Sequence, residues 1–300
     1  MKLVQIFDPK RGYRAGKLEG DIVYPVYYEE KGLRTMLDLV EYATALDMDL
    51  SELVDELTST EPFAHSLGEI NVVPDKAKFH LAVPIHPPEV WACGVTYKKS
   101  AEFRDEDTQT SKGIYDYVYL AKRPELFFKA TASRCTGPND FIGLRRDAIF
   151  TAVEPELAVV MDGRKKVLGY MVANDVSAWD IERENPLYLP QSKVFRGCCA
   201  LGPVFVTSDE IRDPYTLTIR CEIKRTGQIL FSGDTTLGMM KRKIEELIDF
   251  LFLANTIPTG TVLLTGTGII QTEEAALRES DVVEITIPEI GKLVNVAQRV

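Results

Sequence analysis

The stretch TAVEPELAVVMDGRKKVLGYMVANDVS, residues 151–177, restricts the possible folds of this chain more than any other segment. Two apolar segments flank the polar, turn-forming DGRKK, and this pattern predicts an antiparallel β-hairpin with its turn near residues 164 and 165. The first segment nevertheless opens with the carboxylates Glu154 and Glu156, which share one face of a strand because alternate residues point to the same side. Burying unpaired carboxylates is costly, so the two glutamates need a partner.

The expected hairpin register adds a third acid. If the numbers of facing residues add up to about 329, Glu154 lies opposite Asp175, with Cβ atoms about 4.5–5.5 Å apart. Three converging carboxylates predict a site for a hard cation, Mg²⁺ or else Mn²⁺ or Ca²⁺, rather than for zinc. A slip of one residue would break this arrangement, and Pro155 indicates a strand edge or a bulge. The plainer alternative is a solvent-facing pair of glutamates, with Asp175 capping a turn.

Other charged residues could join such a site. Glu125 and Lys129 share a face of the predicted strand in PELFFKA, and Lys193 stands in LPQSKVFRG. A lysine near a bound cation, in a partly apolar pocket, has a lowered pKa and can act as a base near neutral pH. Backbone amides of the turn around Gly266 and Thr267 could bind a carboxylate. Ordinary surface lysines and an ordinary glycine-rich turn are the alternatives.

Composition limits the partners and the compartment. The net charge of −10 argues against nucleic acid or an anionic membrane as a partner. The sequence has no run of 18 apolar residues, and its N-terminus lacks the apolar segment of a signal peptide, so we expect a cytoplasmic protein. Its five cysteines form no CxxC pair, and we expect reduced thiols. Three scattered histidines argue against a zinc site or a histidine-based triad.

The distribution of apolar segments predicts an α+β, mainly β fold. Residues 1–81 mix strands with two helices, within 33–46 and 49–57, and we expect a small N-terminal α/β domain there. Residues 82–300 contain many short strands, which predict a rolled or barrel-like domain. We also expect one long helix within 239–256, with Met240, Ile244 and Leu247 among its apolar residues.

Seven segments together resemble the fumarylacetoacetate hydrolase superfamily. They are, in the order of the superfamily, CGVTY, PELFFKA, TGPND, EPELAVVM, GYMVANDVSAWD, KVFRGCCALGP and LLTGTG. The resemblance covers residues 82–300 and implies a mixed β-roll, a small-molecule 2-keto acid substrate, and a homodimer or homotetramer. It also implies that Glu154, Glu156 and Asp175 bind a divalent metal, usually Mg²⁺.

The same resemblance implies roles for further residues. Lys193 matches an active-site lysine, and Lys129 and Thr267 match positions near the pyruvoyl end of the substrate. Hydrolases of this superfamily usually carry a histidine in G-x-N-Y-x-x-H and a glutamate three residues further on, which activate water for C–C cleavage. Here GVTYKKSAEF places Ser100 and Phe103 at those two positions, and neither can replace the pair.

A second departure concerns the spacing of the metal carboxylates. Typical hydrolases have a longer insertion between the ExE and the aspartate than the 19 residues that separate Glu156 from Asp175. Both departures resemble the 2-keto-3-deoxy-D-arabinonate dehydratase branch, in which PELFFK supplies an active-site glutamate, here Glu125.

The resemblance therefore implies a Mg²⁺-dependent hydro-lyase that dehydrates a 2-keto-3-deoxy sugar acid to 2,5-dioxopentanoate. Lys193 would be the base at C3, and Glu125 would deliver a proton to the departing C4 hydroxyl. A metal-dependent acylpyruvate hydrolase or oxaloacetate decarboxylase is the first alternative, and a non-catalytic binding protein of the same fold is the second.

Overall fold

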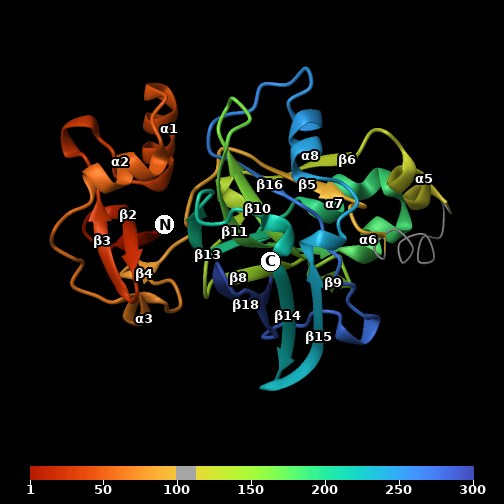
Figure 1. Cartoon of the computed structure of the whole chain (residues 1–300). Helices are drawn as coiled ribbons and strands as arrows, with labels where there is room; N and C mark the ends of the chain where they lie inside the picture. Colours follow the sequence, from red (N-terminus) through yellow and green to blue (C-terminus); the bar gives the residue numbers. More distant parts are fainter. Residues whose placement is uncertain (99–112) are drawn as a thin grey trace.

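The computed structural model describes residues 1–98 and 113–300 (Figure 1). Strands dominate these residues and form both parallel and antiparallel pairs, which confirms the predicted mainly β, α+β class. The strands are β1 (Lys2–Asp8), β2 (Gly12–Glu19), β3 (Ile22–Val26), β4 (His80–Leu81), β5 (Val90–Gly94), β6 (Glu125–Ala130), β7 (Cys135–Thr136), β8 (Phe141–Leu144), β9 (Thr151–Ala152), β10 (Pro155–Met161), β11 (Val167–Asp175), β12 (Ser177–Ala178), β13 (Cys199–Thr207), β14 (Thr218–Arg225), β15 (Gln228–Thr236), β16 (Thr261–Leu264), β17 (Val282–Ile287) and β18 (Gly291–Arg299). The α-helices are α1 (Met36–Leu46), α2 (Leu50–Leu57), α3 (Leu67–Ile70), α5 (Ile114–Leu120), α6 (Trp179–Glu184), α7 (Leu189–Lys193) and α8 (Ile244–Leu251).

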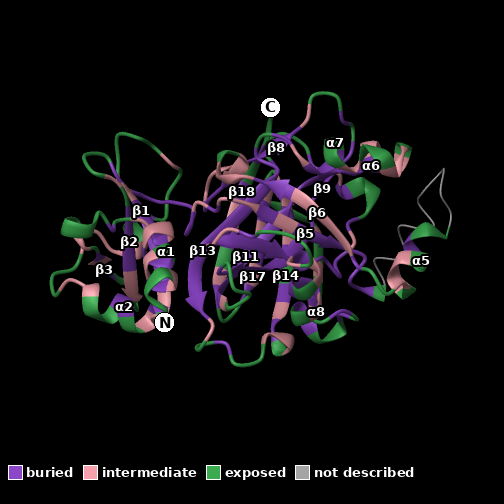
Figure 2. Ribbon diagram, turned by 90° about the horizontal axis from the view of Figure 1, so that it is seen from above, coloured by how far each residue is buried: buried purple, intermediate pink, exposed green. Residues whose placement is uncertain are grey.

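The main sheet has the order β3-β2-β1-β13-β11-β10-β16-β5-β6, with β4 paired to β1 and β7 paired to β13. A second sheet has the order β15-β14-β17-β18-β8, and β12 pairs with β9. Strands β10 and β11 lie in the middle of the main sheet and are buried along almost their whole length (Figure 2). Their central position explains why both read as continuous apolar runs instead of alternating apolar and polar residues.

The N-terminal elements gather at one side of the molecule (Figure 1). Helix α1 begins after Thr35, whose side chain forms a capping box with Asp38, and α2 begins after Asp49, whose carboxylate caps it. Both helices confirm the prediction. Strand β1, however, also pairs with β13, so the main sheet continues across the expected boundary at residues 81 and 82. The division into domains 1–81 and 82–300 stays a prediction.

The long helix predicted within 239–256 is wrong in extent. Helix α8 covers Ile244–Leu251 alone, and Lys243 before it has an extended backbone. Met240 is also buried, but its backbone is extended and pairs with Tyr97 in an isolated β-bridge. The apolar periodicity of the sequence therefore continued beyond α8 into the extended segment around Met240.

All five cysteines are free thiols, as expected. Within residues 1–98 and 113–300, every helix is too short or too polar to span a bilayer.

Candidate metal centre and active site

Strands β10 and β11 form the predicted hairpin. Glu156 lies opposite Ala173, and the backbone N–H of Asp175 donates to the carbonyl of Glu154 at 2.9 Å. The predicted register is therefore confirmed, with Glu154 and Asp175 facing each other across the two chains. Pro155 lies outside the part of β10 that pairs with β16, which begins at Ala158, so its missing N–H interrupts no hydrogen bond to that strand.

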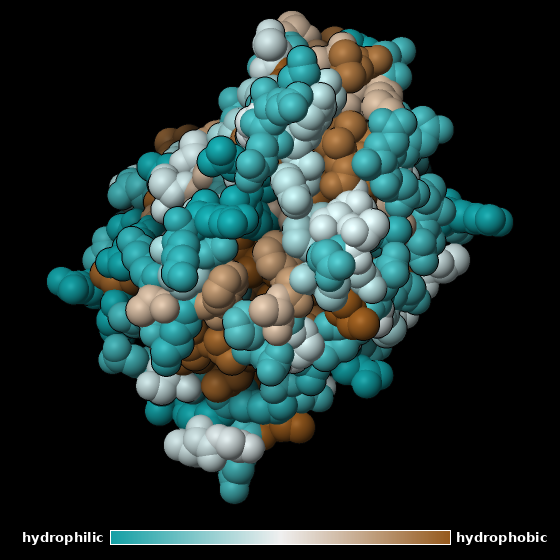
Figure 3. Space-filling view, turned by 90° about the vertical axis from the view of Figure 1, so that its left-hand side faces the viewer, coloured by the Kyte–Doolittle hydropathy of each residue, from teal (hydrophilic) through white to brown (hydrophobic). Residues whose placement is uncertain are grey.

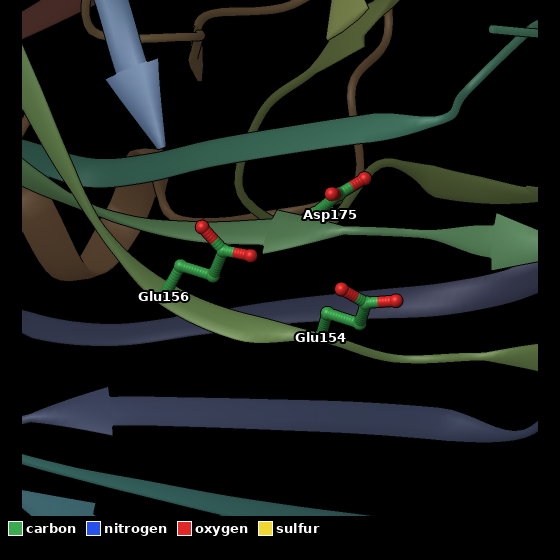
Figure 4. Close-up of side chains that lie close together, drawn as sticks. All are labelled: Glu154, Glu156 and Asp175. Carbon is green, nitrogen blue, oxygen red and sulfur yellow. The ribbon is translucent and has the colours of Figure 1, made fainter. Parts of the chain in front are cut away.

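The three carboxylates of Glu154, Glu156 and Asp175 converge in the protein interior (Figure 4). Each offers an oxygen that lies within 4.8 Å of the other two, and the three residues are only 0–3% exposed. The alternative of a solvent-facing glutamate pair is therefore wrong. Buried acids at this separation repel one another, so the cluster requires positive charge close to it.

Glu156 carries the strongest sign that a cation fits here. Its Oε2 accepts the N–H of Gly266 at 2.6 Å, whereas its Oε1 is buried and has no hydrogen-bond partner in the described part of the chain. Burial, together with the charges of Asp175 and Glu154, raises the pKa of Glu156 well above its usual value. A divalent cation would accept the free oxygen as a ligand and offset the repulsion. Because all the available donors are carboxylate oxygens, the residues fit a hard cation such as Mg²⁺.

Lys193, at the end of α7, reaches the acidic cluster. Its Nζ donates to Oε1 of Glu154 at 2.9 Å, to Oδ2 of Asp175 at 3.0 Å and to Oγ of Ser177 at 2.7 Å. Lys193 is itself buried, so these contacts replace the water that its ammonium group has lost. The structure thus brings the predicted active-site lysine against two of the three acids.

Lys129, on β6, approaches Asp175 from another direction. Its Nζ lies 2.5 Å from Oδ1 of Asp175 and donates to the carbonyls of Val176 and Lys193 at 2.9 and 2.6 Å. Burial lowers the pKa of Lys129, but the charge of Asp175 acts in the opposite direction and the net pKa lies above the usual value. Lys129 therefore neutralises Asp175 and links β6 to α7. Its contact with a substrate, and the lowered lysine pKa expected beside a cation, stay predictions.

Glu125, the first residue of β6, lies across β5 from the cluster. A Cβ atom added to Gly94 would lie 1.9 Å from Oε2 of Glu125, so the glutamate side chain occupies the space above that glycine. Burial raises the pKa of the Cys93 thiol, and the charges of Glu156 and Glu125 raise it further, which places Cys93 near both acids. Glu125 also lines a cavity of about 80 Å³ together with Glu182.

The glycine-rich turn after β16 donates a hydrogen bond to the acidic cluster. Gly266 has φ +87°, and a Cβ there would lie 2.1 Å from Oγ1 of Thr96, so only glycine fits. The N–H of Gly266 donates to the carboxylate of Glu156 and not to a substrate carboxylate. The Thr267 hydroxyl accepts the N–H of Ile269 at 3.1 Å. Substrate binding by Gly266 and Thr267 stays a prediction.

Three residues near the cluster had no predicted role. The Nε1 of Trp179 donates to Oε1 of Glu154 at 2.8 Å, and Ser177 binds Lys193 as described. Both follow Asp175 in VANDVSAWD, so closeness in sequence was the available signal. Tyr97 is buried near Glu156, and its hydroxyl has no hydrogen-bond partner within the described residues. Ser100 and Phe103 lie outside the described residues.

Known proteins resemble this chain over most of its length. Residues 90–298 match the protein family described as "Fumarylacetoacetate (FAA) hydrolase C-terminal". A 2-dehydro-3-deoxy-D-arabinonate dehydratase from Saccharolobus solfataricus is 51% identical over 215 residues, which are 71% of this chain and 72% of that protein. A Haloferax volcanii protein described as "Probable 2-keto-3-deoxyxylonate dehydratase" is 40% identical over 273 residues, or 91% of each chain.

A solved structure extends the likeness to the whole chain. It is a 2-keto-3-deoxy-D-arabinonate dehydratase complexed with magnesium and 2,5-dioxopentanoate, with a TM-score of 0.84 and 37% identity. The match covers 100% of this chain and 99% of the other, and it confirms the expected fold. From its sequence, its fold and the family match over residues 90–298, this chain belongs to the fumarylacetoacetate hydrolase family.

Proposed function

We propose that this protein is a Mg²⁺-dependent hydro-lyase that converts 2-dehydro-3-deoxy-D-arabinonate to 2,5-dioxopentanoate and water. The observation that carries the proposal is the buried cluster of three acids beside Lys193, in a chain 51% identical over 215 residues to a dehydratase of this substrate. In a 2-keto-3-deoxy acid, C2 is a ketone and C3 a methylene, so arabinonate and xylonate lose the stereocentres in which they differ. For sugars of the D series, the names of both dehydratase relatives therefore describe one substrate.

Glu154, Glu156 and Asp175 would hold the cation, as their geometry and the free oxygen of Glu156 support. When bound, Mg²⁺ polarises the C2 carbonyl of the substrate and lowers the pKa of its C3 protons. Lys129 fixes Asp175, Trp179 fixes Glu154, and the N–H of Gly266 fixes Glu156, so all three proposed ligands are held in place by hydrogen bonds or ion pairs from the protein.

Lys193 is the proposed base for C3. Its Nζ lies within 3.0 Å of oxygens of Glu154 and Asp175. It would therefore lie beside a keto acid that is bound at these acids. To accept a proton, Lys193 must be neutral. A cation held by Glu154 and Asp175 would offset part of their charge, and the two ion pairs that hold the proton of Lys193 would then be weaker.

Glu125 is the proposed acid for the C4 hydroxyl. Lys193 takes a proton from C3, and the hydroxyl leaves C4 as water with a proton from Glu125. The remaining 2-keto acid has a C3–C4 double bond and a C5 hydroxyl. Glu125 then removes a proton from C5 while Lys193 returns one to C3, which gives a C4–C5 enol and restores both residues. The enol becomes the C5 aldehyde, and one water has been lost.

The turn around Gly266 and Thr267 would bind the substrate carboxylate, since backbone amides in such turns bind anions. For the setting of the enzyme, we propose the cytoplasm, pentose breakdown and a homodimer or homotetramer. Five free thiols support a reducing compartment. The oligomer rests on the family resemblance alone.

A coupled assay tests the proposal. The protein stripped with EDTA is given 2-keto-3-deoxy-D-pentonate with and without Mg²⁺, and 2,5-dioxopentanoate is measured through an aldehyde dehydrogenase that reduces NAD. We expect semialdehyde only when Mg²⁺ or Mn²⁺ is added. Full activity of the stripped protein would refute the metal requirement, and the absence of semialdehyde under all conditions would refute the dehydration.

A further inference from the structure

A second cavity lies in the N-terminal part of the chain, and none of its lining residues belongs to the acidic cluster. It has a volume of about 310 Å³ and is lined by residues between Asp8 and Phe79. This volume lies at the lower end of the range of small-molecule sites. Its outer wall, residues 59–64, is joined to β3 by two backbone hydrogen bonds, from Ser59 to the carbonyl of Pro25 and from Phe63 to the carbonyl of Val23, both 2.8 Å. The cavity is thus part of the folded framework.

Arg14 is the unusual residue in this cavity. It stands on β2 opposite Ile6, is only 8% exposed and lines the cavity. Within residues 1–98 and 113–300, its guanidinium group has neither a hydrogen-bond acceptor nor an ion-pair partner. The side chain of Arg14 is thus largely covered by protein, while its guanidinium nitrogens stay open to a ligand that enters the cavity.

Among the described residues, a second buried arginine shows the normal arrangement. Arg242 is 4% exposed, and its guanidinium binds Glu246 at 2.7 Å and the carbonyls of Val118 and Ala121 at 3.1 and 2.6 Å. The protein therefore satisfies a buried arginine fully where its role is structural. Arg14, in contrast, lines a cavity and has no such partner among the described residues, which is the arrangement expected of a binding group.

The surroundings of Arg14 indicate which ligand it would bind. Asp8 also lines the cavity, but its Oδ1 already accepts the N–H groups of Lys10 and Arg11, and it forms no ion pair with Arg14. Three carboxylates and two guanidinium groups line the cavity, so a multiply charged anion such as phosphate would be repelled. A single carboxylate matches the planar fork of arginine.

The remaining walls are apolar. Tyr27, Phe63 and Phe79 line the cavity, and together they offer aromatic surface to a flat apolar group. The side of the molecule formed by the N-terminal elements is otherwise largely hydrophilic, with its apolar surface in separate patches (Figure 3). We propose that this cavity binds a small monocarboxylate with an aromatic or flat apolar body, with Arg14 holding the carboxylate.

Thermal shift and calorimetric titrations with 3-phenylpropionate test this site. They are performed on the whole chain in EDTA and without sugar acid, so their outcome is independent of the proposed dehydration. We expect saturable binding of 3-phenylpropionate, and at least tenfold weaker binding of the neutral 3-phenylpropanamide and of inorganic phosphate.

Arg14→Gln should abolish the binding, because glutamine lacks both the charge and the fork. Arg212→Gln is the matched control, since it removes the same charge from an exposed position outside the cavity. Equal binding by the Arg14→Gln variant, equal binding of the amide, or no binding to the unchanged protein would overturn the proposal.

A crystal of the unchanged protein soaked with 4-bromobenzoate decides the matter if Arg14→Gln fails to fold. The anomalous signal of bromine should lie between the aromatic walls, with the carboxylate at Arg14. Bromine only at other places, including a site between two copies of the chain, would contradict the assignment.

Discussion

Lys129 and Asp175 form an ion pair that is almost completely removed from water. Their Nζ and Oδ1 atoms are 2.5 Å apart, and the two side chains are 0% and 1% exposed. A pair of this kind costs much desolvation free energy to assemble, so each charge depends on the other.

Lys129→Met should therefore destabilise the protein strongly, because Asp175 would remain buried beside two other carboxylates. We expect a loss of about 3–5 kcal/mol in the free energy of unfolding in EDTA, measured with urea, and a partial recovery when Mg²⁺ is added. Lys292→Met is the control, since Lys292 pairs with Glu284 at an exposed site and should lose about 1 kcal/mol at most. Equal losses for the two variants would contradict this interpretation.

Lys193→Met should lower kcat by roughly 10²–10⁴-fold, the usual contribution of a general base. Binding of Mg²⁺ should persist, because the three carboxylates remain. Lys193→Arg should not restore turnover, since arginine stays protonated at neutral pH. The measurements are kcat and KM in the coupled assay, and Mg²⁺ affinity by calorimetry. A near-normal kcat in either variant would exclude Lys193 as the base.

The raised pKa of Glu156 predicts a particular pH dependence. Below the ordinary pKa of a glutamate, the group is protonated in both the folded and the unfolded protein, and it has no effect on stability. As the pH rises toward the raised pKa, the unfolded chain loses its proton first, so the protein in EDTA should become less stable. Mg²⁺ requires the ionised form, so its stabilising effect should grow over the same pH interval.

Glu156→Gln should remove both trends. The amide has no proton to lose, and it gives the cation less charge, so Mg²⁺ affinity should fall at least tenfold. Melting temperatures across a pH series, with EDTA and with Mg²⁺, provide the measurement. A Glu156→Gln variant with an unchanged pH profile would show that another group is responsible.

Gly266→Ala should impair both folding and metal binding. The new methyl group would collide with Thr96, and the displaced backbone would withdraw its N–H from Glu156. Gly227→Ala provides the control, because Gly227 has a similar φ of +81° but no atom within 4 Å of an added Cβ. It should cost only about 1–2 kcal/mol for the left-handed backbone. If Gly266→Ala costs no more than Gly227→Ala and binds Mg²⁺ normally, the close contact has been misjudged.

Ser100→His should not create an acylpyruvate hydrolase. Hydrolysis needs a base that activates water, and the histidine would still lack its glutamate partner because Phe103 occupies that position. We expect the unchanged protein and the variant to cleave acetylpyruvate barely, if at all. Efficient cleavage of acetylpyruvate by the unchanged protein, with no semialdehyde from the sugar acid, would favour the hydrolase alternative.

The acidic cluster could be predicted from the sequence because it depends on local structure. Glu154, Glu156 and Asp175 lie on one hairpin with a short turn, so a two-residue period and the turn position predicted that they converge, while the family resemblance decided against a solvent-facing pair. Lys193 is different, because it reaches the cluster from α7 and only the family resemblance indicated it. The contacts of Lys129 and Gly266 depend on which strands are neighbours in the sheet, and no local pattern contains that information.

The same limit explains the incorrect helix. An apolar side chain every third or fourth residue shows that Met240 and Ile244 are both buried, but it does not show which partner buries them. Both side chains belong to the core, but Met240 stands on an extended segment that bridges to Tyr97, and Ile244 is the first residue of α8.

The pairing of β1 with β13 has a consequence for how the chain behaves when it is cut. Lys2 and Leu3 face Val206 and Phe205, so the first strand covers an edge of the central sheet. A fragment that lacks residues 1–81 would expose that edge, with its unpaired N–H and carbonyl groups and two apolar side chains. Exposed edges of this kind recruit strands from other molecules. We therefore expect residues 82–300 to aggregate more readily without the N-terminal segment, and we expect the two parts of the intact chain to unfold in one cooperative transition.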